Sequence, residues 1–542
     1  MASVSPGVPG APGVSRRDAL RLAPVLGAAA LCAGPAGCSL GRGSSAPATT
    51  TPTVAAAIPD GVITAGLSEA VGGHGYDPMR TTGALALAAN WHTMEGLTEL
   101  HPEDRQVYAA LGDDLPSAID DTTYEVTLRK GAVFSNGSPV TVEDVLFSFQ
   151  RVLDPANGSV YTKFLDFLEA VTIKDETTIT VTTKIPYMLV SERLSVVKIV
   201  PREVVEADPE GFDSMPVGSG PYRMTDNGAQ SQTVVFERND HYNGPLPALA
   251  KSMTWQVLPD ATARANAIVS GTVQVINAAP LADLPTMANP VTVAREQAFA
   301  PVFAMFNCST LSDTRARQAI MYALDYEEIC TTGMAGLATP ATCYVQEGHP
   351  AYRKAATVYG YDPARAASLL AEAGITAIRA MCTDHTLLAG VRPIIKKNLE
   401  ALGVPVTFTE RQAAAAYEAI DSGQEVVDVL FAPEDPSIFG ADADLLLRWF
   451  YSSDLWADTR VRWKGSESYL AVQAALDEAV GLTGGPRLTA WRRAFDIIAE
   501  QVPLYPLFHR ITPTAYDAST LPGFKPIALP GLSFVDVGSA KA

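Results

Sequence analysis

The histidines, carboxylates and glycines of this chain are the residues whose types and spacing could do chemistry. The seven histidines lie far apart, and none stands in the His-Glu-x-x-His spacing of a zinc protease. No Gly-x-Ser-x-Gly segment occurs after residue 57, and no spacing among the many carboxylates singles out an acid/base pair. Gly218 and Gly220 lack the further residues of a phosphate-binding loop. These patterns favour a binding protein over an enzyme, with no metal site and no cofactor.

A cysteine near the start of the chain stands in a pattern typical of lipidation. Paired arginines, Arg16 and Arg17, precede an apolar segment, 22–37, which is short for a hydrocarbon core of about 30 Å. Small residues then lead to Cys38, and this pattern resembles a bacterial lipobox. The resemblance implies that Cys38 is acylated and becomes the mature N-terminus. An ordinary signal peptide with an incidental cysteine is the alternative, and the paired arginines leave a twin-arginine export route open.

The lipobox pattern divides the first part of the chain into two segments. Residues 1–37 are expected to be a signal peptide. Residues 38–57 are rich in Pro and Thr and have no periodic apolar face, so we expect a flexible tether. Together they predict a protein held at the outer face of the cell membrane by its lipid alone.

Four further cysteines follow the tether, and their spacing is not that of a metal site. None belongs to a Cys-x-x-Cys pair, and an oxidising compartment would allow disulfides. Four cysteines can pair in three ways, and unpaired buried thiols are equally compatible with the sequence. The four are Cys308, Cys330, Cys343 and Cys382.

Length and charge narrow the class of protein. The 542 residues suggest two to four domains, and 47% hydrophobic with 18% charged residues is ordinary for a globular chain. The formal net charge of −19 should repel nucleic acid, so we do not expect DNA or RNA as a partner.

The elements that must position any site follow an alternating order in the second half of the chain. Asp362-Pro363 and Gly374 punctuate one predicted helix, and a stripe from Val391 to Leu402 predicts another. Apolar strands at 404–408 and 426–431 follow, which predicts a mainly parallel α/β sheet.

The first half of the chain has a different pattern. Residues 123–128 and 177–183 alternate polar and apolar side chains, as strands of a half-exposed sheet do. Between them, Thr141 and Asp144 predict a capped helix, and Asn136-Gly137 predicts a tight turn. Farther along, Arg315 and Arg317 are expected to pair with carboxylates near a helix start.

A long block of residues carries a resemblance to a known family. Residues 124–139 read Tyr-Glu-Val-Thr-Leu-Arg-Lys-Gly-Ala-Val-Phe-Ser-Asn-Gly-Ser-Pro and run into Thr-Val-Glu-Asp-Val at 141–145. Later blocks agree in the same order, namely 216–222, 237–242, 306–307 and 313–319. The chain resembles the family 5 extracytoplasmic solute-binding proteins of peptide and nickel ABC importers, over roughly residues 58 to 535.

This resemblance implies a fold in the α/β class. It is the two-lobed, periplasmic-binding-protein-like arrangement with a ligand held between the lobes, and the first lobe carries a β-rich insertion. Lobe I would comprise 58–100, 213–305 and 506–542. The insertion subdomain would be 101–212, and lobe II would be 306–505. Hinge closure around the ligand then signals loading to the importer.

The resemblance also places candidate ligand-binding residues on loops that face the cleft. A peptide needs a carboxylate for its α-ammonium group and aromatic rings for its side chains. The candidates are Tyr76, Trp91, Glu95, Asn307, Glu434, Asp435, Tyr505 and Phe508.

One departure from the family pattern concerns the ammonium anchor. Peptide-binding members carry a Trp and then an Asp about three residues before the Asp-Pro pair. Here Ala432 stands at that spacing before Asp435-Pro436, and no Trp occurs in 426–431. Either Glu434 replaces the aspartate, or the ligand has no free amine at that place.

The predicted function is therefore the capture of a solute and its delivery to the permease subunits of an ABC importer. A short peptide is the expected solute. We expect a monomer that touches the membrane through its lipid anchor only. Three alternatives stay open, namely a non-peptide solute, chelated nickel, and a ligand-sensing receptor without transport.

Overall fold

A computed structural model describes residues 56–69, 75–81, 83–159, 161–288 and 290–542. The predicted signal peptide, Cys38 and the tether up to residue 55 lie outside the described residues. No helix in these described ranges is long and apolar enough to cross a membrane.

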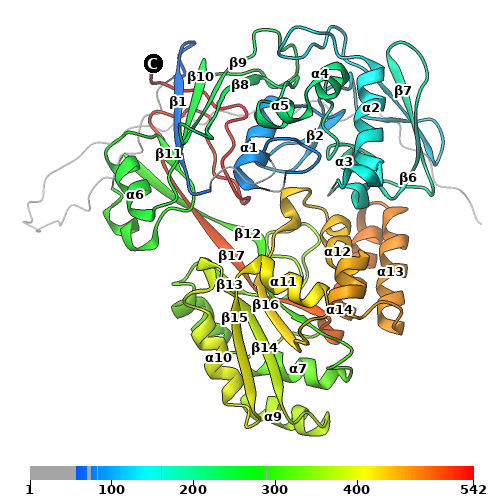
Figure 1. Cartoon of the computed structure of the whole chain (residues 1–542), viewed down its shortest axis with the longest axis vertical. Coiled ribbons are helices and arrows are strands. Elements are labelled where there is room, and N and C mark those ends of the chain that lie inside the picture. Colours follow the sequence, from blue (N-terminus) through cyan, green and yellow to red (C-terminus); the bar gives the residue numbers. More distant parts are fainter. Residues whose placement is uncertain (1–55, 70–74, 82, 160, 289) are drawn as a thin grey trace, which may run out of the picture. The chain divides into compact units, whose positions relative to one another are not determined.

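One mixed sheet runs through both lobes (Figure 1). Within the described residues it contains eleven strands, of which β13 (Ala338–Pro340) pairs with β17 beside the main path. The main path runs in the order β15 (Val406–Arg411), β14 (Ile378–Thr383), β16 (Val429–Pro433), β12 (Val291–Phe306), β17 (Leu504–Asp517), β11 (Val275–Ile276), β1 (Val62–Leu67), β10 (Ser252–Val257), β9 (Thr233–Arg238) and β8 (Tyr222–Asn227).

Two long antiparallel strands, β12 and β17, connect the lobes. Their register runs from Val291 opposite Asp517 to Met305 opposite Leu504, and it shifts between Gln297 and Pro301. A bulge of this kind bends a strand and re-aims its side chains. The boundaries predicted at 305/306 and 505/506 fall inside these strands, so the chain crosses between lobes while it stays in one sheet.

The parallel sheet predicted for lobe II is confirmed. Strand β14 pairs in parallel with both β15 and β16. The preceding helix α9 (Pro363–Glu372) starts at the Asp362 cap, and Gly374 follows it with φ +67°. Helix α10 (Arg392–Glu400) is also present, and Gly403 follows it with φ +79°. Only glycine takes these left-handed angles without strain, which is why both helices stop there.

The insertion subdomain contains its own sheet, of order β4 (Ser117–Ala118), β5 (Thr123–Thr127), β7 (Thr178–Thr183) and β6 (Leu168–Ile173). A hairpin of β2 (Thr98–Leu100) and β3 (Val107–Ala109) joins it to lobe I. The predicted capping box is present on α2 (Val142–Leu153), where Thr141 accepts from the Asp144 N–H and Asp144 accepts in return. Gly137 takes φ +88°, as the predicted turn requires.

The remaining helices pack on these sheets. Their bounds are α1 (Ala84–Thr93), α3 (Val190–Leu194), α4 (Arg202–Ala207), α5 (Pro209–Ser214), α6 (Ala261–Val269), α7 (Thr314–Ala323), α8 (Tyr326–Glu328), α11 (Ala413–Asp421), α12 (Ala443–Tyr451), α13 (Glu467–Val480) and α14 (Gly484–Gln501). Single turns include the 3₁₀ helix η6 (Pro436–Ile438) and the π-helix η7 (Asp454–Arg460).

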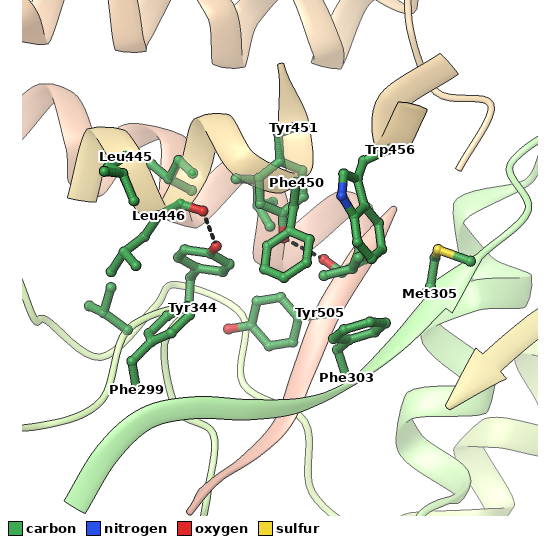
Figure 2. Close-up of a cluster of buried hydrophobic side chains, with 14 of the residues drawn as sticks. Phe299, Phe303, Met305, Tyr344, Leu445, Leu446, Phe450, Tyr451, Trp456 and Tyr505 are labelled. Atoms are coloured by element: carbon green, nitrogen blue, oxygen red, sulfur yellow. Dashed lines mark hydrogen bonds between the residues drawn. The ribbon is translucent and has the colours of Figure 1, made fainter. Parts of the chain in front are cut away.

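Aromatic side chains fill the core beside the crossing strands (Figure 2). Tyr344 donates to the Leu446 carbonyl at 2.5 Å, and Tyr451 donates to the Leu504 carbonyl at 2.7 Å. The Phe303 and Phe450 rings meet edge to face at 5.5 Å. This packing holds the lobe II end of β12 and β17 in place.

One arginine of the α7 motif departs from its prediction. Arg315 pairs with Asp313 as expected. Arg317 instead donates to the backbone carbonyls of Gln501 and Leu311. It is 3% exposed, and carbonyl oxygens at the end of α14 satisfy its guanidinium there in place of a carboxylate.

Candidate functional site

A small cavity lies where lobe I and the insertion subdomain meet lobe II. Its volume is about 50 Å³. From the first side come Asn90, Trp91, Arg105 and Tyr161, and from lobe II come Ile438 and Phe439. The Tyr161 and Phe439 rings meet edge to face at 5.4 Å, so an aromatic wall joins both sides. We name this space the polar cavity.

Charged groups line the polar cavity. Lys198 and Glu99 form an ion pair at 2.5 Å, which satisfies both. Arg105 donates to the Ser437 carbonyl at 3.4 Å, while its Nε has no hydrogen-bond partner among the described residues. The Asn90 amide oxygen is likewise buried without a partner there. Such groups cost free energy unless a ligand or water binds them.

A second cavity of about 330 Å³ lies along β17. Ala278 and Ala279 line it from lobe I, and Met334 and Ala335 line it from lobe II. Arg510 is the one charged residue in this lining. Its Nε donates to the Ala300 carbonyl at 3.1 Å. We name this space the apolar cavity.

Backbone strain marks both cavities. Arg105 has φ +58°, Ala278 has φ +45° and Ala335 has φ +48°. Left-handed angles are unfavourable for residues with a Cβ atom, and they persist where surrounding structure enforces them, often at ligand sites.

Asp435 lines neither cavity, but it lies near enough to Arg105 and Arg510 to attract both guanidinium groups. Its Oδ1 caps η6 by accepting from the Ser437 N–H at 3.1 Å and the Ser437 hydroxyl at 2.5 Å. Its Oδ2 is buried, and no hydrogen bond reaches it within the described ranges. Burial raises the pKa of Asp435, while nearby Arg510, the Ser437 hydrogen bonds and the backbone N–H of Ala300 lower it.

The two arginines are themselves incompletely paired. Neither Arg105 nor Arg510 has a carboxylate oxygen within 4.0 Å among the described residues, although several lie farther off. Burial lowers the pKa of Arg105 to about 10, against the attraction of Glu99 and Asp435. Burial also lowers the pKa of Arg510, against Asp435 and Glu69. Each cavity therefore contains one guanidinium group that has no carboxylate oxygen within 4.0 Å among the described residues.

Glu434 lies beside a different group of side chains. Burial raises its pKa to about 7, while Arg460 lowers it and Asp435 raises it further. The Arg460 guanidinium stacks between the Tyr417 ring at 4.2 Å and the Trp456 ring at 4.4 Å. Glu434 lines neither the polar nor the apolar cavity.

Trp91 is thus the predicted residue that lines the polar cavity. Asp435 lines neither cavity and is linked to Arg105 through Ser437. Tyr76 is 1% exposed in the lobe I core, where its hydroxyl donates to the Asn227 carbonyl at 2.7 Å. Glu95 is 3% exposed and forms an ion pair with Arg129 at 3.0 Å. Both side chains are therefore occupied by contacts within the protein.

The remaining candidates lie inside lobe II or at its far end. Tyr505 and Phe508 are buried in the core beside the crossing strands, as Figure 2 shows for Tyr505. Asn307 lines a separate cavity of about 310 Å³ with Arg460 and Arg462. Farther along β17, Phe508 is fully buried, whereas Arg510 lines the apolar cavity.

Sequence reasoning missed the cleft arginines. Arg105 stands between two short strands with no motif of its own. Arg510 could have been found, because it lies two residues beyond Phe508 on a strand expected to cross between lobes. The four later cysteines, which the structure describes, are all free thiols.

The described residues contain no group of three His, Cys, Asp or Glu side chains placed to hold a metal ion.

Comparison with known proteins agrees with this architecture. Glutathione-binding protein GsiB of Salmonella paratyphi A is 25% identical over 474 residues, which span 85% of this chain and 91% of that protein. Heme-binding protein A of Haemophilus influenzae is 26% identical over 466 residues, with coverages of 78% and 83%.

Solved structures share the two-lobed fold. The peptide-bound, ABC transporter-associated protein DppA of Helicobacter pylori superposes with a TM-score of 0.76 at 19% identity, covering 89% of this chain and 98% of that one. The dipeptide-binding protein of Pseudoalteromonas sp. SM9913, in complex with Met-Leu, gives 0.74 at 17% identity, with coverages of 88% and 100%.

The sequence also matches a family description over residues 106–454, which is more than half of the chain. The chain therefore belongs to the bacterial extracellular solute-binding proteins, family 5.

Proposed function

We propose that this protein captures a short peptide in the cleft between its lobes and delivers it to the permease of an ABC importer. The observation that carries the proposal is the cavity between the lobes that Trp91, Tyr161 and Phe439 line, next to which Ser437 bonds both Arg105 and the Asp435 carboxylate. A carboxylate in this position can accept from the ammonium group of a peptide. The sequence left open whether Glu434 replaces the missing aspartate or the ligand has no free amine. In this proposal Asp435 binds the ammonium group instead.

The surroundings of Asp435 suit the rest of a peptide. Aromatic side chains of the polar cavity, Trp91, Tyr161 and Phe439, offer apolar faces to ligand side chains. Arg105 and Arg510 offer donors to carboxylate or carbonyl oxygens. Because these groups come from both lobes, a ligand that binds all of them favours the closed arrangement.

The relatives support a peptide over other solutes. Several have peptides in their names or structures, namely glutathione, Met-Leu and a tetrapeptide written STSA. Two other relatives are named for ligands that are not peptides. They are a heme-binding protein and NikZ of Campylobacter jejuni, which was solved in complex with Ni(L-His). A chelated metal or another non-peptide solute is thus the second candidate.

Location completes the proposal. Acylation at Cys38 would anchor the protein to the outer face of the cell membrane, and residues 38–57 would tether a monomeric binding domain there. Mass spectrometry of protein extracted from membranes tests this step. The wild-type protein should carry the mass of the lipid, whereas the Cys38→Ala variant should lack it and be released from the membrane.

Native mass spectrometry tests the function. Protein lacking residues 1–40 is purified without refolding, and whatever it carries is released and sequenced. Short peptides of mixed sequence are the expected cargo. A metal chelate or other small molecule would instead support the second candidate. Peptide capture would be contradicted if the protein carries no ligand and mixed peptide pools do not change its melting temperature.

A further inference from the structure

The apolar cavity is the larger of the two spaces that both lobes line, with about 330 Å³ against about 50 Å³ in the polar cavity. A volume of this size lies in the range that small ligands occupy in proteins. What the apolar cavity can hold depends on the side chains around it, and these are of two kinds. This inference rests on the proposed function, because it names the part of the peptide that the cavity holds.

The first kind is a single positive charge. Arg510 donates its Nε to the Ala300 carbonyl, and neither of its terminal nitrogens makes a hydrogen bond to the described residues. Both terminal nitrogens are accessible rather than buried without a partner. A planar guanidinium with two free donors can bind both oxygens of one carboxylate side by side.

The protein's own carboxylates do not fill this place. Asp435 and Glu69 attract Arg510, yet neither has an oxygen within 4.0 Å of its nitrogens. Glu69 accepts from the Asn277 amide at 2.7 Å, and Asp435 accepts from Ser437 at 3.1 Å. Burial lowers the pKa of Arg510 against these attractions, so the guanidinium is partly removed from water and has no close counter-ion. An anionic ligand would supply that counter-ion.

The second kind of lining is apolar. Among the described residues that line the cavity, only Arg510 and Thr512 carry a polar side chain. Met334, Leu337 and Leu387 contribute apolar side chains from lobe II, opposite the two alanines of lobe I. Such walls gain free energy when they remove an apolar group of a ligand from water.

The polar and apolar parts of the lining belong to one space. Thr512 lies two residues after Arg510 on β17, so side-chain alternation puts both on the same face of the strand. The strained residues Ala278 and Ala335 line the same space from opposite lobes. A ligand that contacts the whole lining must therefore carry a negative charge next to an apolar group.

We infer that the apolar cavity holds a carboxylate with an adjoining apolar group, and that Arg510 pairs with this carboxylate. In a peptide, this chemistry occurs at the C-terminal residue when its side chain is apolar. Arg510 then selects a free C-terminus, and the apolar walls select the last side chain. A small free carboxylic acid has the same chemistry, so the test includes both sources.

Calorimetric titration of the wild-type protein with matched tripeptides tests the inference. Ala-Ala-Leu should bind about tenfold or more tightly than its C-terminal amide, because the amide has no charge for Arg510. It should also bind about tenfold or more tightly than Ala-Ala-Asn, whose last side chain is similar in size but polar. Arg510→Gln should abolish the preference for the acid over the amide and keep the preference for leucine over asparagine.

Arg202→Gln is the control for the loss of an arginine. It removes an exposed arginine of the insertion subdomain, paired with Glu206 and outside the lining of the apolar cavity, and should keep both preferences. Melting curves establish that each variant is folded, and the comparison of probes on the wild-type protein does not depend on any variant.

The failing outcomes are distinct for the inference and for the proposed function. Equal affinity of the wild-type protein for the acid and the amide, or for the leucine and asparagine peptides, would overturn this inference and leave peptide capture standing. The free acid 4-methylpentanoate should bind more weakly than Ala-Ala-Leu. Equal affinity for both would support the chemistry of the cavity and contradict peptide capture. Failure of every probe to bind would overturn both.

Discussion

Two groups of buried charges lie at the junction of the lobes, and they differ in how completely they are paired. On α3 of the insertion subdomain, Arg193 is 2% exposed and bonds Asp442 of lobe II at 2.5 and 2.8 Å. It also bonds Asp444 at 3.0 Å, which in turn accepts from Arg448 at 2.9 Å. In the cleft, Arg105, Arg510 and Asp435 have no such contacts among the described residues.

The difference separates structural charges from charges available to a ligand. Fully paired buried ions hold the protein together, because removal of one partner leaves the other uncompensated. Incompletely paired ions cost stability in the empty protein, and a ligand that completes them recovers this cost. The comparison predicts opposite outcomes for substitutions in the two groups.

The largest effect is expected for Arg193→Met. This change leaves Asp442 and Asp444 buried with less positive charge, and should lower the free energy of unfolding by about 3–5 kcal/mol. Urea denaturation measures it. Arg202→Gln, at an exposed i,i+4 pair, is the matched control and should cost less than about 0.5 kcal/mol. Equal losses in both variants would show that the Arg193 network contributes no more to stability than an exposed ion pair.

A smaller, pH-dependent effect is expected for Glu434→Gln. Burial raises the folded-state pKa of Glu434 from 4.5 to about 7, so the folded protein binds more protons than the unfolded chain between these values. Stability from this group therefore falls as pH rises from about 4.5 to about 7. The variant should match wild type at pH 4.5 and be more stable by about 1–3 kcal/mol at pH 8.

Thermal unfolding at both pH values measures the Glu434 effect. A stability difference that is the same at pH 4.5 and pH 8 would show that the carboxyl is not held in a raised-pKa environment.

The smallest effect on stability, and the most informative, is expected for Asp435→Asn. Asparagine still caps η6 but removes the poorly compensated charge, so the empty protein should gain about 0.5–2 kcal/mol. Peptide affinity should fall about tenfold or more, because the ammonium loses its partner. Melting and titration of the same sample separate these results. Lost stability with unchanged affinity would make Asp435 a structural residue.

Local signals in the sequence were sufficient for most of the fold. Capping residues and glycines placed α2, α9 and α10, and continuous apolar runs placed the parallel strands of lobe II. These features depend on neighbours in the chain. The family resemblance supplied the two-lobed arrangement, which comes from pairing between β12 and β17 about two hundred residues apart and has no local signature.

The candidate site was harder to predict. Asp435 could be named because it follows the predicted strand at 426–431, whereas Trp91 was expected on a loop and lies inside α1. Tyr505 and Phe508 have the same residue types as ligand contacts, yet both are buried in the core, where the Tyr505 ring meets the Tyr359 ring edge to face at 6.1 Å. Which side chain of a crossing strand faces a cavity depends on register and on the bulge at Gln297, and neither is encoded nearby.

A crystal structure of the protein with the ligand that it carries from the cell tests peptide capture. We expect a peptide held between the lobes against Trp91, with its ammonium group on Asp435, while the Arg193 network stays unchanged. A non-peptide ligand, or a peptide bound away from these residues, would contradict the proposal.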